Sequence, residues 1–191
     1  MAKFKLGIVV GSNRRDSINR KLAEALAKLG SDAFEAEFIQ IDDLPIYNQD
    51  NEQPLPAPAA RMKAEIEAAD AVLFVTAEHS RSIPAVLKNA IDWGARPYGK
   101  NSWAGKPAAV TGTTSGAIST AVAQAHLRAV LNSGVGMHVL GGEAYIQFKP
   151  ELIDAAGNVA DDSARKFLKG FIDQFAVFAS RFAPLEATAA A

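Results

Sequence analysis

The sequence predicts an α/β fold in which a parallel sheet of five strands carries helices on both faces. Three observations favour this class. Short apolar runs alternate, about five times, with longer stretches whose apolar residues recur at helical spacing, as in strand–helix units that pack in parallel. Polar loops follow several of these runs. The chain has 191 residues, of which 49% are hydrophobic, so it can bury one sizeable core.

The first half of the chain supplies three strands and two helices. The run FKLGIVV stops at Gly11, and AVLFVT is the clearest buried strand in the chain. Between these runs, apolar side chains share one helix face, and the proline-rich stretch PLPAPAA precedes a second helix. We expect strands at 4–10, 36–41 and 71–76, helices at 19–29 and 59–69, and an irregular loop between 42 and 50.

The second half continues the alternation. Pro84 lies near the first turn of a helix, where proline is tolerated. The last helix carries a stripe of phenylalanines, which we expect to be core: Phe167, Phe171, Phe175 and Phe178. We expect helices at 85–93, 119–131 and 162–182, and strands at 107–110 and 137–140. One domain then spans residues 1–183, and residues 184–191 form a mobile tail with nothing to pack against.

The composition excludes several classes of protein. The formal net charge is −1, and acidic and basic residues are interspersed, which argues against nucleic-acid binding. The chain has no cysteine, so disulfides, thiolate catalysis and iron–sulfur clusters are excluded. The amino-terminal apolar run is too short for a signal peptide or a membrane span. We therefore expect a cytoplasmic protein without a membrane span.

The loop GSNRRDS, residues 11–17, carries more polar residues than a simple connection needs. The amino end of a helix offers unpaired N–H groups and a partial positive charge, which suit a phosphate. Ser12, Ser17 and Asn19 add hydrogen-bonding groups, and Arg14 adds a fixed charge. The loop therefore predicts a phosphate site. A plainer alternative is that Ser17 or Asn19 only caps the helix and that Arg14 and Arg15 are solvated.

Other nucleotide loops fit this stretch poorly. A dinucleotide fingerprint needs glycines that are missing at positions 13 and 16, and a P-loop needs a lysine that the turn does not contain. A mononucleotide or phosphosugar site remains. The polar loops 11–19, 77–84 and 111–116 all follow predicted strands, and ligands of such sheets bind beyond the carboxyl ends of the strands. We expect these three loops to form one site.

Three stretches resemble the NAD(P)H-dependent FMN reductase family, in the branch that contains bacterial chromate and quinone reductases. They are GSNRRDSIN, EHSRSIPAVLKNAIDW, and AGKPAAVTGTTSGA with AQAHLRAVL, and the similarity extends from about Lys5 to Phe178. The resemblance implies a flavodoxin-like fold with strand order 2-1-3-4-5 and FMN as the cofactor. It also implies phosphate contacts from Ser12, Arg14, Ser17 and Asn19.

The resemblance extends the cofactor site to three segments. The second segment follows the isoalloxazine edge, and Thr114 faces the ring. The implied residues are Ser12, Asn13, Arg14, Arg15, Asp16, Ser17, Ile18, Asn19, Glu78, His79, Ser80, Arg81 and Thr114. The chain has Ala77, Glu78, His79 and Ser80 where family members commonly have Pro-Glu-Tyr-Asn. Histidine keeps a flat ring at that place, and serine shortens a side chain expected to reach the flavin.

The function that the resemblance implies is NAD(P)H oxidation through FMN, with hydride passing via flavin N5 in ping-pong kinetics. Small-molecule acceptors such as quinones, chromate, ferric complexes, azo dyes or free flavin then take the electrons. An FMN-binding electron carrier without nicotinamide chemistry, or a phosphosugar-binding domain without flavin, is the alternative. The resemblance also implies a homodimer or homotetramer, with Arg96, Pro97, Tyr98, Lys100 and Glu143 as interface residues.

We expect most of the remaining histidines, charged residues and aromatic residues to support the fold and not to take part in binding or catalysis. His79, His126 and His138 lack the spacing of metal ligands, and we expect the last two to be structural. We expect the cluster of Lys88, Asn89 and Asp92 to fix the loop before it, and Trp93 to be core. Tyr47, Tyr98 and Trp103 are expected to be exposed, walling a substrate slot or a subunit interface.

Overall fold

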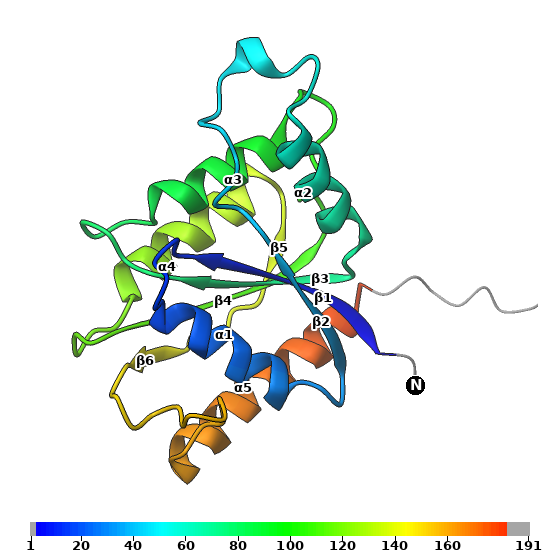
Figure 1. Ribbon diagram of the computed structural model, residues 1–191. Coiled ribbons are helices and arrows are strands. Elements are labelled where there is room, and N and C mark those ends of the chain that lie inside the picture. Colours follow the sequence, from blue (N-terminus) through cyan, green and yellow to red (C-terminus); the bar gives the residue numbers. More distant parts are fainter. Residues whose placement is uncertain (1–2, 183–191) are drawn as a thin grey trace, which may run out of the picture.

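The computed structural model describes residues 3–182 and has three layers (Figure 1). A parallel sheet lies in the middle, α1 and α5 cover one face, and α2, α3 and α4 cover the other. The strands are β1 (Phe4–Gly11), β2 (Phe34–Ile39), β3 (Ala71–Thr76), β4 (Pro107–Thr114), β5 (His138–Val139) and β6 (Tyr145–Gln147). The helices are α1 (Ile18–Leu29), α2 (Ala57–Ala68), α3 (Ala85–Ala95), α4 (Ala121–Ala129) and α5 (Asp162–Ser180), with short turns η1 (Gln49–Asn51) and η2 (Val130–Gly134).

The strand order is β2-β1-β3-β4-β5, as expected, and every strand pairing in it is parallel. Strand β6 also pairs in parallel with β4, so that β5 and β6 share one edge of the sheet. Gly11 stands opposite Thr76, and β4 runs on to Thr114. The carboxyl ends of β1, β3 and β4 therefore open on the same edge, and the loops that follow them gather there (Figure 1).

Two hydrophobic cores flank the sheet, because both faces of its central strands are buried. Every residue of β3 is buried, as expected for a parallel strand covered on both sides. One core packs α1 and α5 against the sheet around Leu22, Leu26 and Phe175. The other packs α2, α3 and α4 around Phe74 and Trp103.

The differences from the expected elements have local causes. Strand β2 lies two residues earlier than expected, because the chain leaves the sheet after Ile39. The fifth strand, predicted at 137–140, is present but shorter, as β5; strand β6 was not predicted, and residues 140–144 form an excursion between β5 and β6. The predicted helix 119–131 ends in a turn of π-helix, η2, and Gly136 then takes a φ of 73°. Phe167 was expected in the core but is 50% exposed, whereas Phe171 and Phe175 are buried.

Two sequence expectations concern the carboxyl-terminal tail and the absence of a membrane span. The tail predicted for residues 184–191 lies outside the described residues. Of the helices within residues 3–182, none combines the length and apolar character that crossing a membrane requires.

Candidate functional site

The first loop leads directly into α1 at the open edge of the sheet. Ser17 is the N-cap of the helix, and its Oγ accepts from the Arg20 N–H at 3.3 Å. The N–H groups of Ile18 and Asn19 have no acceptor in the described part of the chain. A serine hydroxyl that accepts one hydrogen bond still has its own proton to donate. The start of α1 therefore presents three donors that face no protein acceptor.

Two arginines stand on the same loop. Arg14 and Arg15 are exposed, and neither forms an ion pair within residues 3–182. They line a hollow of about 440 Å³ together with Ser12, Asn13, Ser17 and Arg20, and with the end of β2 and residues 40–42 opposite. The charge and donors of this hollow suit an anion that carries several acceptor oxygens.

Asn19 holds the start of α1 in place. It is only 2% exposed. Its Nδ2 donates to the Thr113 carbonyl at 3.1 Å, and its Oδ1 accepts from the Thr113 N–H at 2.9 Å. Both polar atoms of the side chain are thus used by β4. A phosphate contact from Asn19 would come from its main-chain N–H, not from the side chain expected to make it.

The second loop forms a tight hairpin beyond β3. His79 and Ser82 pair through two main-chain hydrogen bonds of 3.0 and 2.9 Å. The two residues between them, Ser80 and Arg81, have φ values of 49° and 62°, the signature of a type I′ turn. Such turns favour glycine or asparagine, and each non-glycine residue there costs about 1–3 kcal/mol. Strained backbone at the mouth of a site is typical of function.

Glu78 ties this hairpin to the next loop. Its carboxylate accepts from the Ala123 N–H in the first turn of α4 at 3.0 Å and from Arg81 Nη1 at 3.0 Å. The side chain of Glu78 is 8% exposed, whereas that of Arg81 is 66% exposed, so the contact with Ala123 is the more sheltered of the two. A carboxylate at the amino end of a helix also complements the helix dipole. Glu78 therefore fixes the position of the hairpin relative to α4, and its carboxylate is engaged with protein groups.

The third loop, residues 114–120, runs from β4 to α4. Thr114 Oγ1 accepts from the Gly116 N–H at 3.1 Å, which shapes the turn. Ser119 is buried with a φ of 52°. Its hydroxyl accepts from the Ile146 N–H at 3.1 Å and lies within donating distance of the carbonyls of Ile146 (2.7 Å) and Gly112 (3.2 Å). The loop is thus anchored to β6 while residues 115–118 stay exposed.

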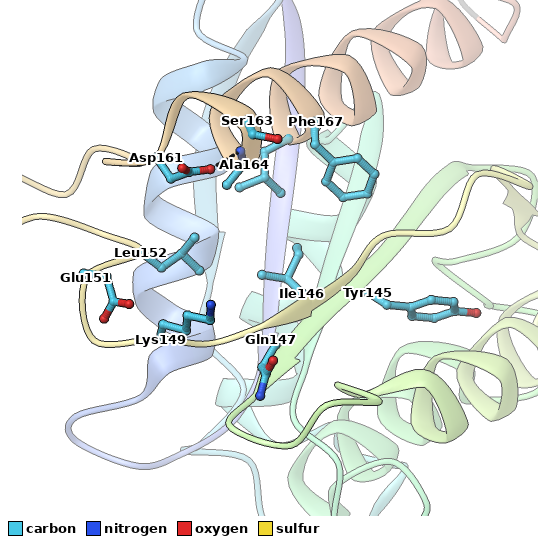
Figure 2. A pocket seen from close by; sticks show the side chains of 11 residues that line it. Tyr145, Ile146, Gln147, Lys149, Glu151, Leu152, Asp161, Ser163, Ala164 and Phe167 are labelled. Carbon is cyan, nitrogen blue, oxygen red and sulfur yellow. Dashed lines mark hydrogen bonds between the residues drawn. The ribbon is translucent and has the colours of Figure 1, made fainter.

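A larger hollow, of about 550 Å³, lies on the α1–α5 side of the sheet (Figure 2). It separates β6 and the segment 147–152 from the first turns of α5. Its wall is partly apolar, with Ile146, Leu152 and Phe167, and Asp161 at its rim already caps α5 through the Ala164 N–H. We place the candidate site at the three loops because donors without protein acceptors and strained backbone meet there.

Several other expectations need correction. Trp103 is fully buried, packs with its ring tilted against Phe74 and donates to the Ile91 carbonyl at 3.0 Å, so it belongs to the core and does not wall a slot. Tyr47 is half-buried against Trp93, whereas Tyr98 is 92% exposed.

The cluster on α3 also acts differently from the expectation. Lys88 pairs with Asp92 at 2.7 Å on the surface of the helix. Asn89 fixes the loop at Pro45 and Tyr47, accepting from the Tyr47 N–H and donating to the Pro45 carbonyl. Asn89 therefore holds the loop after β2, not the loop after β3.

Sequence reasoning missed three contributions to the site. Ser82 Oγ lies 2.8 Å from His126 Nδ1, so the hairpin is linked to α4 a second time. His126 was expected to be structural, but it is exposed and contacts the site loop. The role of Ser119 could not be inferred from sequence, because nothing in the sequence shows that a loop serine is buried or has a positive φ. Within residues 3–182, no three His, Cys, Asp or Glu side chains gather as a metal site would require.

The donor set fits a phosphate ester. Two main-chain N–H groups, the Ser17 hydroxyl and the exposed Arg14 can all donate, and Asp16 is the one carboxylate within the loop 11–17. A phosphate monoester carries nearly two negative charges and three strong acceptor oxygens at pH 7. The two strained loops stand beyond β3 and β4, on the same sheet edge, where a flat ring attached to that phosphate could lie.

Comparison with known proteins identifies a family. The family model described as NADPH-dependent FMN reductase matches residues 4–151. A 2-hydroxy-1,4-benzoquinone reductase of Burkholderia sp is 45% identical over 175 residues, which are 92% of this chain and 96% of that protein. A quinone reductase of Pseudomonas putida is 44% identical over 174 residues, 91% of this chain and 93% of that protein. The solved structure of the flavoenzyme NAD(P)H:(acceptor) oxidoreductase FerB of Paracoccus denitrificans has a TM-score of 0.90 and 46% identity, and the match covers 94% of this chain and 98% of that one.

Proposed function

The chain belongs to the NADPH-dependent FMN reductase family, and we propose that it is an FMN-dependent NAD(P)H oxidoreductase acting on quinones. The observation that carries the proposal is the start of α1, where N–H groups without an acceptor among residues 3–182 and the Ser17 hydroxyl lie beside a hollow that Arg14 also lines. The alternative of a phosphosugar-binding domain without flavin does not account for the family.

We assign the FMN phosphate to the amino end of α1. The N–H groups of Ile18 and Asn19 would donate to it, with the Ser17 hydroxyl and Arg14 completing the contacts. Ser12, Asn13, Arg15 and Asp16 form the rest of the loop around it. These roles are proposals supported by the open donors and by the exposed guanidinium groups.

We assign the isoalloxazine ring to the space between the hairpin 78–81 and the loop that begins at Thr114. The rigid hairpin would present main-chain groups of Ser80 and Arg81 to the edge of the ring, since the Glu78 carboxylate is occupied by Ala123 and Arg81. Thr114 would contact the ring on the side opposite the hairpin. Replacement of the usual asparagine by Ser80 then matters less, because the backbone supplies the contact.

FMN, when bound, takes hydride from NAD(P)H and passes the electrons to an acceptor, so the chain itself needs to bind and orient. Relatives that cover more than nine-tenths of the chain are named quinone reductases, which favours quinones as acceptors. Chromate, ferric complexes, azo dyes and free flavin remain further candidates. Donor and acceptor would use one slot in turn, giving ping-pong kinetics with parallel double-reciprocal plots.

The test is the visible spectrum of the purified protein under anaerobic conditions, before and after NADPH or NADH is added. The proposal expects a bound flavin spectrum that bleaches with a nicotinamide and returns when a quinone is added. A flavin that stays oxidised in excess NADPH and NADH would favour the electron carrier. A protein that stays colourless after FMN is added would favour the phosphosugar-binding domain.

We also propose that the protein is a homodimer or homotetramer. Four large apolar side chains are exposed near the site loops and the adjacent segments: Ile46, Tyr98, Ile118 and Val122. Large apolar side chains exposed on a surface are common at interfaces. Arg96, Pro97, Tyr98, Lys100 and Glu143 stay candidate interface residues, and a light-scattering mass of a single chain would refute the assembly. A cytoplasmic location stays a prediction.

A further inference from the structure

We propose that the outer face of α5 binds a second copy of this chain, with the two α5 helices antiparallel across a two-fold axis. The inference does not depend on the flavin function. Helix α5 packs on one face of the sheet, whereas α3, which leads into residues 96–100, packs on the other (Figure 1). Of the interface candidates proposed above, only Glu143 lines a hollow beside α5. The contact is therefore separate from an interface at residues 96–100.

One stripe of side chains runs along α5 on its outer face. Residues spaced by three and four positions share one face of a helix. Phe167 and Val177 are the large apolar residues of this stripe, and they are 50% and 60% exposed. None of the stripe is buried, and its members are Ser163, Phe167, Gly170, Gln174, Val177 and Arg181.

Three hollows follow this stripe from one end to the other. Their volumes are about 550, 450 and 400 Å³, and neighbouring hollows share the side chain of Phe167 or Gln174. Their opposite wall belongs to the segment 140–152 at the edge of the sheet. Figure 2 shows the first hollow, between β6 and the start of α5. The hollows therefore form one groove beside the helix, long enough for another helix to lie along it.

Gly170 stands near the middle of the stripe. Glycine is unfavourable in the interior of a helix. A Cβ at this position would have no heavy atom of residues 3–182 within 4 Å, apart from its chain neighbours and the backbone of the helix itself. Packing within the described chain therefore does not require a glycine here. A second helix would require one, because the side chains at a helix contact set how closely the two axes approach.

The order of residues along the stripe makes it complementary to itself. A two-fold axis at the level of Ile172 places Phe167 of each copy against the partner's Val177, so the exposed apolar side chains cover each other twice. The same axis places Gly170 against the partner's Gln174, a small residue against a long one. Two-fold interfaces need this kind of self-complementary surface.

The two ends of the stripe carry opposite charges. Asp161 and Asp162 stand at the start of α5, and the Asp162 side chain is 87% exposed. Arg181 at the other end is exposed and forms no ion pair within residues 3–182. Antiparallel helices bring each Arg181 to the partner's Asp162, whereas parallel helices would bring like charges together. Charge complementarity thus favours the antiparallel pair.

The groove is also large enough for a stable contact. Helix α5 has 19 residues, which span about 28 Å. A strip of that length and about 20 Å wide, two helix diameters, buries roughly 1,100 Å² over both copies. Specific interfaces bury more than about 1,000 Å² in total. A second copy of this chain therefore suffices to cover the groove.

The test is sedimentation equilibrium of the full-length protein over a wide range of concentrations. The variants are Phe167→Glu, Val177→Lys and the double variant that carries both changes. The two positions lie about 15 Å apart along one helix, so the introduced charges do not meet within a chain. The matched control is Ser180→Lys, because Ser180 is exposed on the same helix but lies off the stripe. Circular dichroism checks that each variant is folded.

Each single variant should raise the dissociation constant of the contact at least about tenfold, because it sets an unpaired charge against an apolar side chain. The average mass should then fall toward half of the parent's mass. The double variant should associate within about threefold of the parent, since the two introduced charges face each other across the axis. Ser180→Lys should keep the parent's mass.

Three results would overturn the proposal: a parent that stays a single chain at every concentration, single variants with the parent's mass, or a double variant no better than the singles. A different occupant of the groove would give one of the first two results. Gly170→Leu should also weaken the contact at least about tenfold by overpacking, although leucine is the better helix former. Unchanged association of that variant would contradict the close approach. FMN binding and reduction by NADPH should stay unchanged in all variants, so a failure of the flavin function would be seen separately.

Discussion

Removal of the Asn19 side chain tests how the site is built. Asn19→Ala deletes the donor to the Thr113 carbonyl and the acceptor for the Thr113 N–H. Thr113 is fully buried, so water cannot replace either partner. Leaving a buried polar group without a partner costs about 1–3 kcal/mol. The Thr113 N–H and carbonyl are two such groups. Because the surrounding structure can relax in part, we expect the free energy of unfolding to fall by about 3 kcal/mol.

The assay is urea unfolding of the flavin-free protein, followed by the fluorescence of the two buried tryptophans, Trp93 and Trp103. Asn13→Ala is the matched control, because Asn13 is exposed on the same loop and should change stability by less than about 0.5 kcal/mol. Asn19→Asp should be less stable at pH 8 than at pH 5, since only the neutral acid can donate to Thr113. A loss below about 1 kcal/mol for Asn19→Ala would refute the reasoning, because it would mean that Thr113 finds other partners.

Three further substitutions address the site and its frame. Arg14→Ala should weaken FMN binding at least tenfold, as expected for a charge-assisted contact of about 1.5–3 kcal/mol, whereas Arg165→Ala should not change it; equilibrium dialysis measures both. Gly112→Ala should prevent stable folding, judged by circular dichroism, because a Cβ there would lie 2.0 Å from the Thr76 carbonyl oxygen. Glu78→Ala should lower the free energy of unfolding by about 1–2 kcal/mol through the lost contact with α4, and an unchanged urea midpoint would show that this contact contributes nothing.

The sheet could be predicted from sequence because its central strands are short, nearly continuous apolar runs. AVLFVT is apolar up to Thr76 and FKLGIVV nearly apolar, and both are central strands covered on both faces. Strand β6 escaped the prediction, because it has only three residues, Tyr145–Gln147, and two of them are exposed. Arg128 of α4 holds the excursion between β5 and β6 by donating to the Leu140 and Gly142 carbonyls, a contact between separate elements that periodicity does not reveal.

The site loops could be located from sequence, but the hydrogen-bond partners of their side chains could not. Polar loops after strands mark the open edge of a parallel sheet, and the structure brings those loops together there. Asn19, Glu78 and Asn89 each bind main-chain groups far away in the chain. Such partners depend on the final packing. Trp103 was misjudged for the same reason: it follows a loop, yet it closes the core beside Phe74.

The most direct measurement of the central claim compares FMN with riboflavin, which lacks the phosphate, in binding to flavin-free protein. If the amino end of α1 holds the phosphate through two or more hydrogen bonds, FMN should bind at least about a hundredfold more tightly, a difference of roughly 2.7 kcal/mol. In Arg14→Ala the two affinities should move closer together. Equal binding of FMN and riboflavin by the parent protein would contradict the account.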